Sequence, residues 1–465
     1  MEQNVNTSVL QAAYNAWMAS SQLRKSRFRC KQFTYGSQWI DSCSDANGKI
    51  ISDWDRYSQN GSIPVTNNLI RQMVRTIVGR YRSQVIDSTE YISPVRKDVA
   101  IFNELNELDS RCLEEFLVSG CCIQRVDNSI EMGDTHTVVT NINPNLFFVN
   151  AMSDIRSWDC EIVGQLHDLS IAQLIQRLAD GSRRKARWLR KLYTENATGR
   201  AEAFSHAVGA DNISGCNFWQ PLSPGKCRAI EVWTLESREV MMFHNKRTAQ
   251  LSVENSNDAS HHKNDPDTTH KWGVITTWHC RWFSPMGDLL AEWDSPYQHR
   301  HHPFVMKFYP LTDGEVHSFV EGLIDQQKHV NRMITMLDQI MASCAKGVLL
   351  YPASALPDGF TWNDVRKVWS STGGILPYSA QFGDAKPEQI SANATNMGGY
   401  EMVKLQMQLL EEVSGVSGAM QGKDVTSGNS AQLYKAQAEN ANLAMTDIYG
   451  TFSAFRHQRD SMLPA

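Results

Sequence analysis

The stretch that decides the fold is VHSFVEGLIDQQKHVNRMITMLDQIM, residues 316–341. Its apolar side chains recur at alternating steps of four and three residues, which is the spacing of one face of an α-helix. The positions on this stripe, with Gln327 as the single polar member, are Val316, Val320, Leu323, Gln327, Val330, Ile334, Leu337 and Met341. The spacing predicts a long helix over residues 316–343 with a narrow contact face.

Two further helices are predicted towards the C-terminus. Residues 397–414 place Tyr400, Val403, Met407 and Leu410 on one stripe. Residues 430–459 repeat the alternating spacing at Tyr434, Ala438, Ala441, Met445, Ile448, Phe452 and Phe455, and the polar run SGNS (427–430) offers side chains that can cap that helix. Narrow stripes suit helices that pack on copies of themselves, but a bundle within one chain fits equally well.

Two different connections separate these three helices. Residues 344–394 carry four prolines, the short apolar runs GVLLY and GGILPY, and a small helix around Trp362 to Trp369, so we expect a compact α/β insertion there. The segment SGVSGAMQGKDVTSGNS (414–430) holds four glycines. Glycine loses the most backbone entropy on ordering, so this segment is predicted to be a mobile loop.

Upstream of residue 316 the chain mixes helix and strand. Helices are expected over 8–33, from Pro64 to residue 84, over 98–119 and over 170–181, with strands and turns between 134 and 170. The runs AIEVWTLESREVMMF and GVITTWHCRWF lie within 228–243 and 273–293 on either side of a polar segment (254–271), which predicts a long hairpin. The fold class expected is therefore α+β.

Charge sets limits on the function. The chain has 465 residues and a formal net charge of −5, whereas a protein that grips DNA phosphates along a groove should be basic. Basic residues cluster at 24–31 and at 183–191, and the second cluster contains Trp188. Each cluster is interpreted either as a solvated or subunit-facing surface or as a contact with nucleic acid. No apolar run is long enough to span a membrane, no signal peptide is expected, and the ten cysteines lack a paired pattern, which favours reduced thiols in the cytoplasm.

No catalytic motif is complete. A phosphate-binding loop would need glycine where Ser417 stands and Ser or Thr where Asp424 stands, and no Gly-x-Gly turn for a dinucleotide occurs. The clusters His261–His262 and His299, His301 and His302 are interpreted as exposed or packing histidines rather than metal ligands. We therefore expect no enzyme activity, no cofactor and no metal.

Four segments, in order along the chain, resemble those of tailed-bacteriophage portal (head–tail connector) proteins. WMASSQLRKSRFRCKQFTYGSQW (17–39) is similar to that family's N-terminal helix and its Tyr-x-Gly-x-x-Trp element. NGSIPVTNNLIRQMVRTIVGRYRSQ (60–84) resembles the helix that opens after a proline turn and ends in Gly-x-x-Arg. SFVEGLIDQQKHVNRMITML (318–337) resembles a helix with glycine, glutamine and asparagine at set spacing, here Gly322, Gln326 or Gln327, and Asn331. EEVSGVSGAMQGKDVTSGNSAQLYKAQAENANL (411–443) resembles the stretch before the family's long helix.

The resemblance implies a portal-like subunit with the following parts. Residues 1–315 would form the wing, 316–343 and 395–414 the two stem helices, 344–394 the clip, 415–429 the tunnel loop and 430–465 a long wing helix with a short or missing crown. The stem seam would be Val320, Leu323, Gln327, Val330, Ile334 and Leu337, the clip surface Trp362, Trp369 and Tyr378, and the DNA channel loop Gly418, Gln421, Gly422, Lys423 and Asp424.

The implied function is a ring of about twelve copies, closed by identical contacts, at one vertex of the virion. Double-stranded DNA would pass through it without sequence recognition during packaging and ejection. The implied partners are the large terminase subunit, a tail adaptor, and the major capsid and scaffolding proteins, with assembly in the host cytoplasm and no membrane contact. The alternatives are another head–tail adaptor or capsid-associated protein and, with less support from the motifs, a packaging ATPase or nuclease.

Overall fold

The computed structural model describes residues 2–44, 48–59, 63–87, 94–131, 134–195, 216–247, 251–255, 268–346, 348–370, 375–379, 387–390, 398–416 and 431–463. These residues divide into two compact units. The first unit comprises residues 1–35, 70–324 and 414–465, and the second comprises residues 36–69 and 325–413. Residues 36–69 therefore belong with the second unit, whereas we had expected them in a wing that ran over 1–315.

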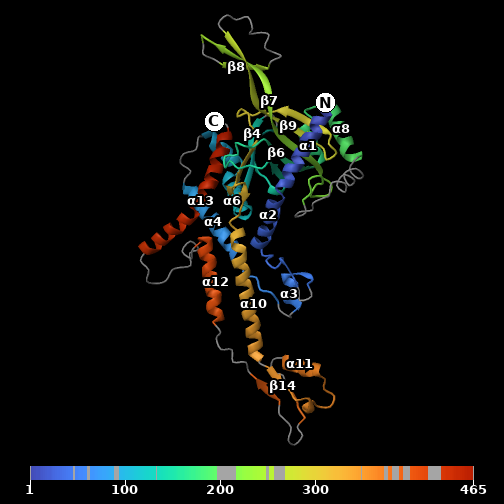
Figure 1. Ribbon diagram of the computed structural model, residues 1–465, viewed down its shortest axis with the longest axis vertical. Coiled ribbons are helices and arrows are strands. Elements are labelled where there is room, and N and C mark those ends of the chain that lie inside the picture. Colours follow the sequence, from blue (N-terminus) through green and yellow to red (C-terminus); the bar gives the residue numbers. More distant parts are fainter. Residues whose placement is uncertain are drawn as a thin grey trace. The chain divides into compact units, whose positions relative to one another are not determined.

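An antiparallel sheet forms the centre of the first unit. Its strand order is β10 (Leu289–Asp294), β9 (Thr268–Phe283), β7 (Cys227–Asn245), β6 (Ile162–Leu169) and β5 (Phe147–Val149), and β8 (Leu251–Asn255) pairs with the far end of β7. Strands β7 and β9 pair from Ile230–Phe283 to Asn245–Thr268 and project as a long hairpin (Figure 1). The hairpin predicted from the two β-rich runs is confirmed.

Both faces of this sheet are buried where β7 pairs with β6, and alternate side chains of β7 enter the two clusters. On β7, Ile230 and Val232 join the cluster under α1 (Glu2–Ala19), in which Trp17 also lies. The neighbouring positions Ala229 and Trp233 join the cluster on the other face, which is covered by α7 (Ile171–Leu178) and α8 (Arg183–Glu195). Helix α7 begins at a capping box in which Ser170 and Gln173 satisfy each other's backbone amides.

The rest of the first unit joins a smaller sheet to helices. Strands β11 (Phe304–Phe308), β3 (Cys121–Glu131) and β4 (Asp134–Asn141) pair antiparallel in that order, η2 (Pro144–Leu146) precedes β5, and β12 (Pro310–Thr312) pairs with β13 (Glu315–Val316). The helices here are α2 (Ser21–Thr34), α4 (Leu69–Asp87), α5 (Pro94–Phe102), α6 (Leu105–Ser119) and α13 (Ala431–Met462). Helix α6 ends at Gly120 with φ +73°, where an added Cβ would lie 2.9 Å from Val316 Cγ1, so only glycine fits.

Helix α13 packs as its spacing predicted. Met445, Ile448, Phe452 and Phe455 are all buried. Phe452 contacts the ring of Tyr81 on α4 edge to face at 5.4 Å, and Tyr449 Oη donates a hydrogen bond to the carbonyl oxygen of Ile77 at 3.0 Å. The side chains of Tyr434, Ala438 and Ala441 lie outside the described residues. Helices α13 and α4 therefore lie side by side (Figure 1).

The second unit contains long helices and a small α/β insertion. Strands β1 (Ser42–Ser44) and β2 (Ile50–Ser52) form a hairpin followed by α3 (Asp53–Gln59). Helix α10 (Ile324–Lys346) leads into β14 (Val348–Leu350), η4 (Ala353–Ala355) and α11 (Trp362–Ser370), and β15 (Glu388–Ile390) pairs antiparallel with β14 before α12 (Gly399–Ser414). The insertion holds the expected small helix and a two-stranded sheet, of which β14 lies in the GVLLY run and β15 at 388–390.

Four helix boundaries differ from expectation, and the first is that of the helix expected from Pro64, which begins at Leu69. The helix predicted to begin at residue 316 begins at Ile324, after β13 and the short η3 (Glu321–Leu323), because Val316 pairs with Pro310 in a hairpin. The helical stretch expected over 8–33 is divided into α1 and α2 at Ser20, and the one over 98–119 is divided into α5 and α6, with Glu104 at φ +49°. Apolar spacing continues from Val316 into α10, so spacing alone could not locate that boundary.

Candidate functional site

The stem seam is mostly buried inside one subunit. Val320, Leu323, Gln327 and Val330 are all less than 3% exposed, and Ile334 and Leu337 are half-buried. The half of the seam that precedes Ile334 thus packs within the chain. Of the two alternatives that the spacing left open, packing within one chain describes these positions.

Gln327 belongs to a polar ladder along α10, formed by Gln327, Asn331 and Thr335. Their side-chain oxygens accept hydrogen bonds from the backbone amides of Leu69, Asn67 and Val65 respectively, each at 3.0 Å. Four residues of helix rise about 6 Å, and two residues of extended chain span about 6.6 Å. Side chains four apart on the helix therefore meet every second amide of the extended segment.

The ladder continues into a network of amide side chains. Gln327 Nε2 donates to the carbonyl oxygen of Asn67 at 2.6 Å and to Asn331 Oδ1 at 3.0 Å. Asn331 Nδ2 donates to Gln38 Oε1 at 2.6 Å, and Gln38 Nε2 donates to Asn68 Oδ1 at 3.1 Å. Buried amides are tolerated only when they are hydrogen-bonded, and these side chains satisfy one another. Either Gln326 or Gln327 could match the glutamine of the portal-like helix. The residue that belongs to the network is Gln327.

Charged pairs fix the same segment on the neighbouring turns of α10. Arg332 Nη2 lies 3.2 Å from Asp53 Oδ2, and Lys328 Nζ lies 3.9 Å from the same carboxylate and also contacts Asp41. Asp53 is almost fully buried. The segment 36–69 is thus held to α10 by polar contacts, which apolar periodicity cannot predict.

The second unit keeps large apolar side chains exposed on both long helices. On α10, Met336 is 56% and Met341 is 71% exposed. On α12, Tyr400 is 73% and Val413 is 57% exposed, although Tyr400 belongs to the stripe that we had expected to be a contact face. The helices approach each other at Gly399, where an added Cβ would lie 2.4 Å from Leu337 Cδ2. These large apolar side chains are therefore available for contact with another molecule.

The predicted clip residues lie on the α/β insertion. Trp362 is 52% exposed and meets Tyr351 edge to face at 6.1 Å, Tyr378 is exposed, and Trp369 is half-buried. Tyr351 Oη donates a hydrogen bond to the carbonyl oxygen of Pro377 at 2.6 Å, which fixes the stretch that carries Tyr378. Trp362 and Tyr378, two of the three aromatic residues predicted for the clip, are therefore exposed and can contact a partner.

The predicted DNA channel loop, Gly418, Gln421, Gly422, Lys423 and Asp424, lies outside the described residues. So do His261 and His262. Among the residues that are described, no group of three metal-ligating side chains converges. His302 is buried between Trp278 and Phe304, and loss of solvent lowers its pKa to about 3, so it packs as a neutral ring.

The first unit contains a buried ionic network that sequence patterns did not indicate. Glu231 Oε2 lies 2.5 Å from Arg125 Nη1 and 2.6 Å from His167 Nε2, and all three side chains are buried. Burial alone would raise the pKa of Glu231, but the charge of Arg125 and the hydrogen bond from His167 hold that pKa well below its usual range. The network joins strands β3, β6 and β7 through buried side chains.

Comparison with known protein families identifies the class. The model of the phage P22-like portal protein family matches residues 109–457, which is three quarters of the chain. The chain therefore belongs to the phage P22-like portal protein family and acts as a portal protein of a tailed phage. This is a family of structural components of the virion rather than of enzymes. No curated protein matches the sequence.

In the part of the chain that the structure describes, no helix combines the length and hydropathy that a membrane span needs.

Proposed function

We propose that copies of this chain form a ring of about twelve subunits at one vertex of the phage head, and that double-stranded DNA enters and leaves through it. Family membership over residues 109–457 is the observation that carries the proposal. The order of parts supports it: a long helix, an α/β insertion, a second helix and the 32-residue α13 follow one another in the expected series.

Surface chemistry supports the division of roles within the ring. The exposed apolar side chains of α10 and α12 suit contact between neighbouring stems, because obligate interfaces between identical subunits are rich in apolar area. The net charge of −5 suits a conduit that lets DNA slide, because a strongly basic wall would hold phosphates. The capsid and scaffolding proteins are the expected partners of the wing, and assembly takes place in the host cytoplasm.

The insertion 344–394 acts as the clip in this proposal and binds the large terminase subunit during packaging and a tail adaptor afterwards. Trp362 and Tyr378 are its exposed aromatic side chains, and aromatic residues are enriched at the energetic centres of interfaces. Residues 415–429 act as the tunnel loop, and Lys423 is its one cationic side chain near the DNA.

Removal of the chain from the phage that encodes it tests the proposal directly. Shells assembled without it should contain no DNA, and supplying the intact chain in trans should restore filled heads. DNA-filled heads that form without the chain would contradict the proposal.

A further inference from the structure

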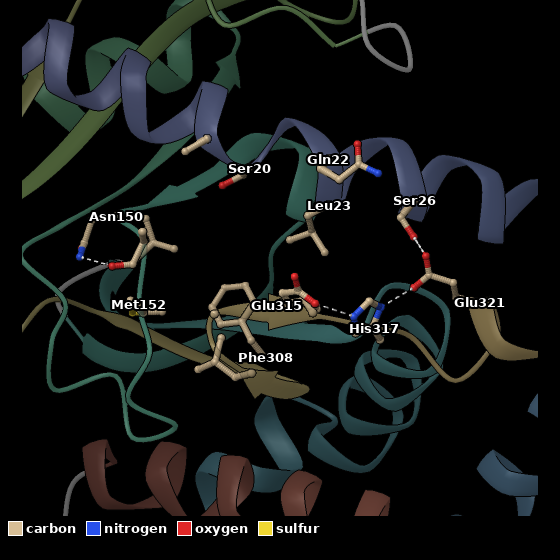
Figure 2. A pocket seen from close by; sticks show the side chains of 16 residues that line it. Ser20, Gln22, Leu23, Ser26, Asn150, Met152, Phe308, Glu315, His317 and Glu321 are labelled. Carbon is tan, nitrogen blue, oxygen red and sulfur yellow. Dashed lines mark hydrogen bonds and ion pairs between the residues drawn. The ribbon is translucent and has the colours of Figure 1, made fainter.

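A pocket in the first unit combines an apolar floor with an acidic rim (Figure 2). It has a volume of about 410 Å³ and lies where the α1–α2 junction meets the β12–β13 hairpin. The side chains of the floor are mostly buried and come from three parts of the unit: Leu23, Val149, Met152, Phe308, Leu311 and Val316. Its size falls within the range of about 300–1,000 Å³ that is typical of binding clefts.

Two carboxylates and a histidine line the rim. Figure 2 shows His317 between Glu315 and Glu321, with ring nitrogens 3.3 Å and 3.4 Å from their carboxylate oxygens, and Ser26 Oγ donates to Glu321 at 3.0 Å. Glu315 is 75% exposed, so its charge is available to another molecule. A side chain with a long apolar body and a cationic end fits such a pocket, because the floor takes the body and the rim takes the charge.

The same unit displays side chains of this kind on α8. Arg183, Arg184, Arg187 and Arg190 are exposed, and no ion pair with a described residue is found for any of them. Trp188 is 39% exposed and lies one helical turn after Arg184, so the two occupy one face. Leu189 anchors the opposite face of α8 in the core. Arginine and tryptophan are the types most enriched at interface hot spots.

The acidic rim of the pocket and the cationic face of α8 are therefore complementary in charge, and they are made of different residues. We propose that the pocket receives the Arg184–Trp188 face of α8 from a second copy of this chain. A contact between two different patches is head to tail, and its repetition closes a ring when the rotation between neighbours is a whole fraction of a turn. The proposal rests on the proposed ring function and names the residues of one contact between its subunits.

Charge reversal with rescue tests the contact in the full-length chain. The variants are Glu315→Arg, Arg184→Glu and the double variant, and the matched controls are Glu239→Lys and Lys97→Glu, which reverse exposed charges elsewhere in the unit. Arg184 lies in the first turn of α8, where a carboxylate is favoured by the helix dipole, so Arg184→Glu should fold normally. The measured quantity is the protein concentration at half-assembly, from sedimentation velocity at fixed salt.

Each single reversal should raise that concentration about tenfold, and the double variant should return to within about threefold of the original chain. Singles that match the controls, or a double variant that assembles no better than the singles, would overturn the contact while leaving the ring intact. If Arg184→Glu weakens binding of a 30-base-pair duplex but not assembly, α8 faces nucleic acid and the proposal is wrong. An original chain that stays monomeric at all concentrations would overturn the ring itself.

Discussion

Removal of one rung of the polar ladder should loosen one defined stretch of backbone. In Gln327→Leu the amide of Leu69 and the carbonyl of Asn67 both lose their partner on α10, while the apolar volume is roughly kept. An unsatisfied backbone group costs about 1–3 kcal/mol when buried, and these two are partly buried, so we expect a loss of about 2–4 kcal/mol. Thr335→Val removes the acceptor for the Val65 amide and the hydrogen bond that Thr335 Oγ1 donates to the carbonyl oxygen of Asn331, and it should cost about 1–2 kcal/mol.

Hydrogen–deuterium exchange of peptides that cover residues 63–70 measures this effect where it occurs. Since 1.4 kcal/mol corresponds to a tenfold change in an equilibrium, Gln327→Leu should speed exchange at Leu69 by at least about tenfold, and Thr335→Val should act mainly at Val65 by less. Asp338→Ala, an exposed position three residues after the last rung, is the control and should change nothing. If residues 63–70 exchange at the same rate in all three variants, the polar ladder is not what holds this segment.

Three further predictions concern other parts of the chain. The pKa of His302 is lowered to about 3, so between pH 3 and about pH 6.5 the unfolded chain binds more protons than the folded chain. The free energy of unfolding should therefore fall as the pH drops through this window. In denaturant titrations, His302→Asn should make the free energy of unfolding less dependent on pH. Deletion of residues 354–375 should abolish terminase docking in pull-downs with little change in the melting of the first unit, and normal packaging rates in that variant would show that the insertion is not the clip. Lys423→Glu should weaken DNA retention in filled heads while ring assembly stays normal, since an exposed ion pair contributes only about 0–1 kcal/mol; unchanged retention there, and in a shortened loop, would reduce residues 415–429 to a linker.

Apolar periodicity predicted the elements whose neighbours are also apolar. The stripe of α13 is buried at Met445, Ile448, Phe452 and Phe455, and the β-rich runs pair as β7 and β9. Over the described part of the α13 stripe, the four-and-three spacing of the sequence matches the buried face of the helix.

Positions whose partners are polar and distant in sequence were not predicted. Gln327 sits on the apolar stripe of α10 but is buried for its hydrogen bonds to residues 258 and 260 positions away. Val316 continues the same stripe and yet forms a strand, because its partner Pro310 lies before the helix. The pocket rim likewise brings Ser26 to Glu321, which are 295 residues apart. Such contacts depend on tertiary structure, and no local pattern encodes them.

We propose that this portal protein works as a closed ring around DNA. Native mass spectrometry of the purified full-length assembly gives its mass, and electron microscopy gives its symmetry. We expect a closed ring of about twelve copies with one central opening wide enough for a DNA duplex. Monomers or open filaments at every protein and salt concentration, or a closed assembly without a central opening, would contradict it.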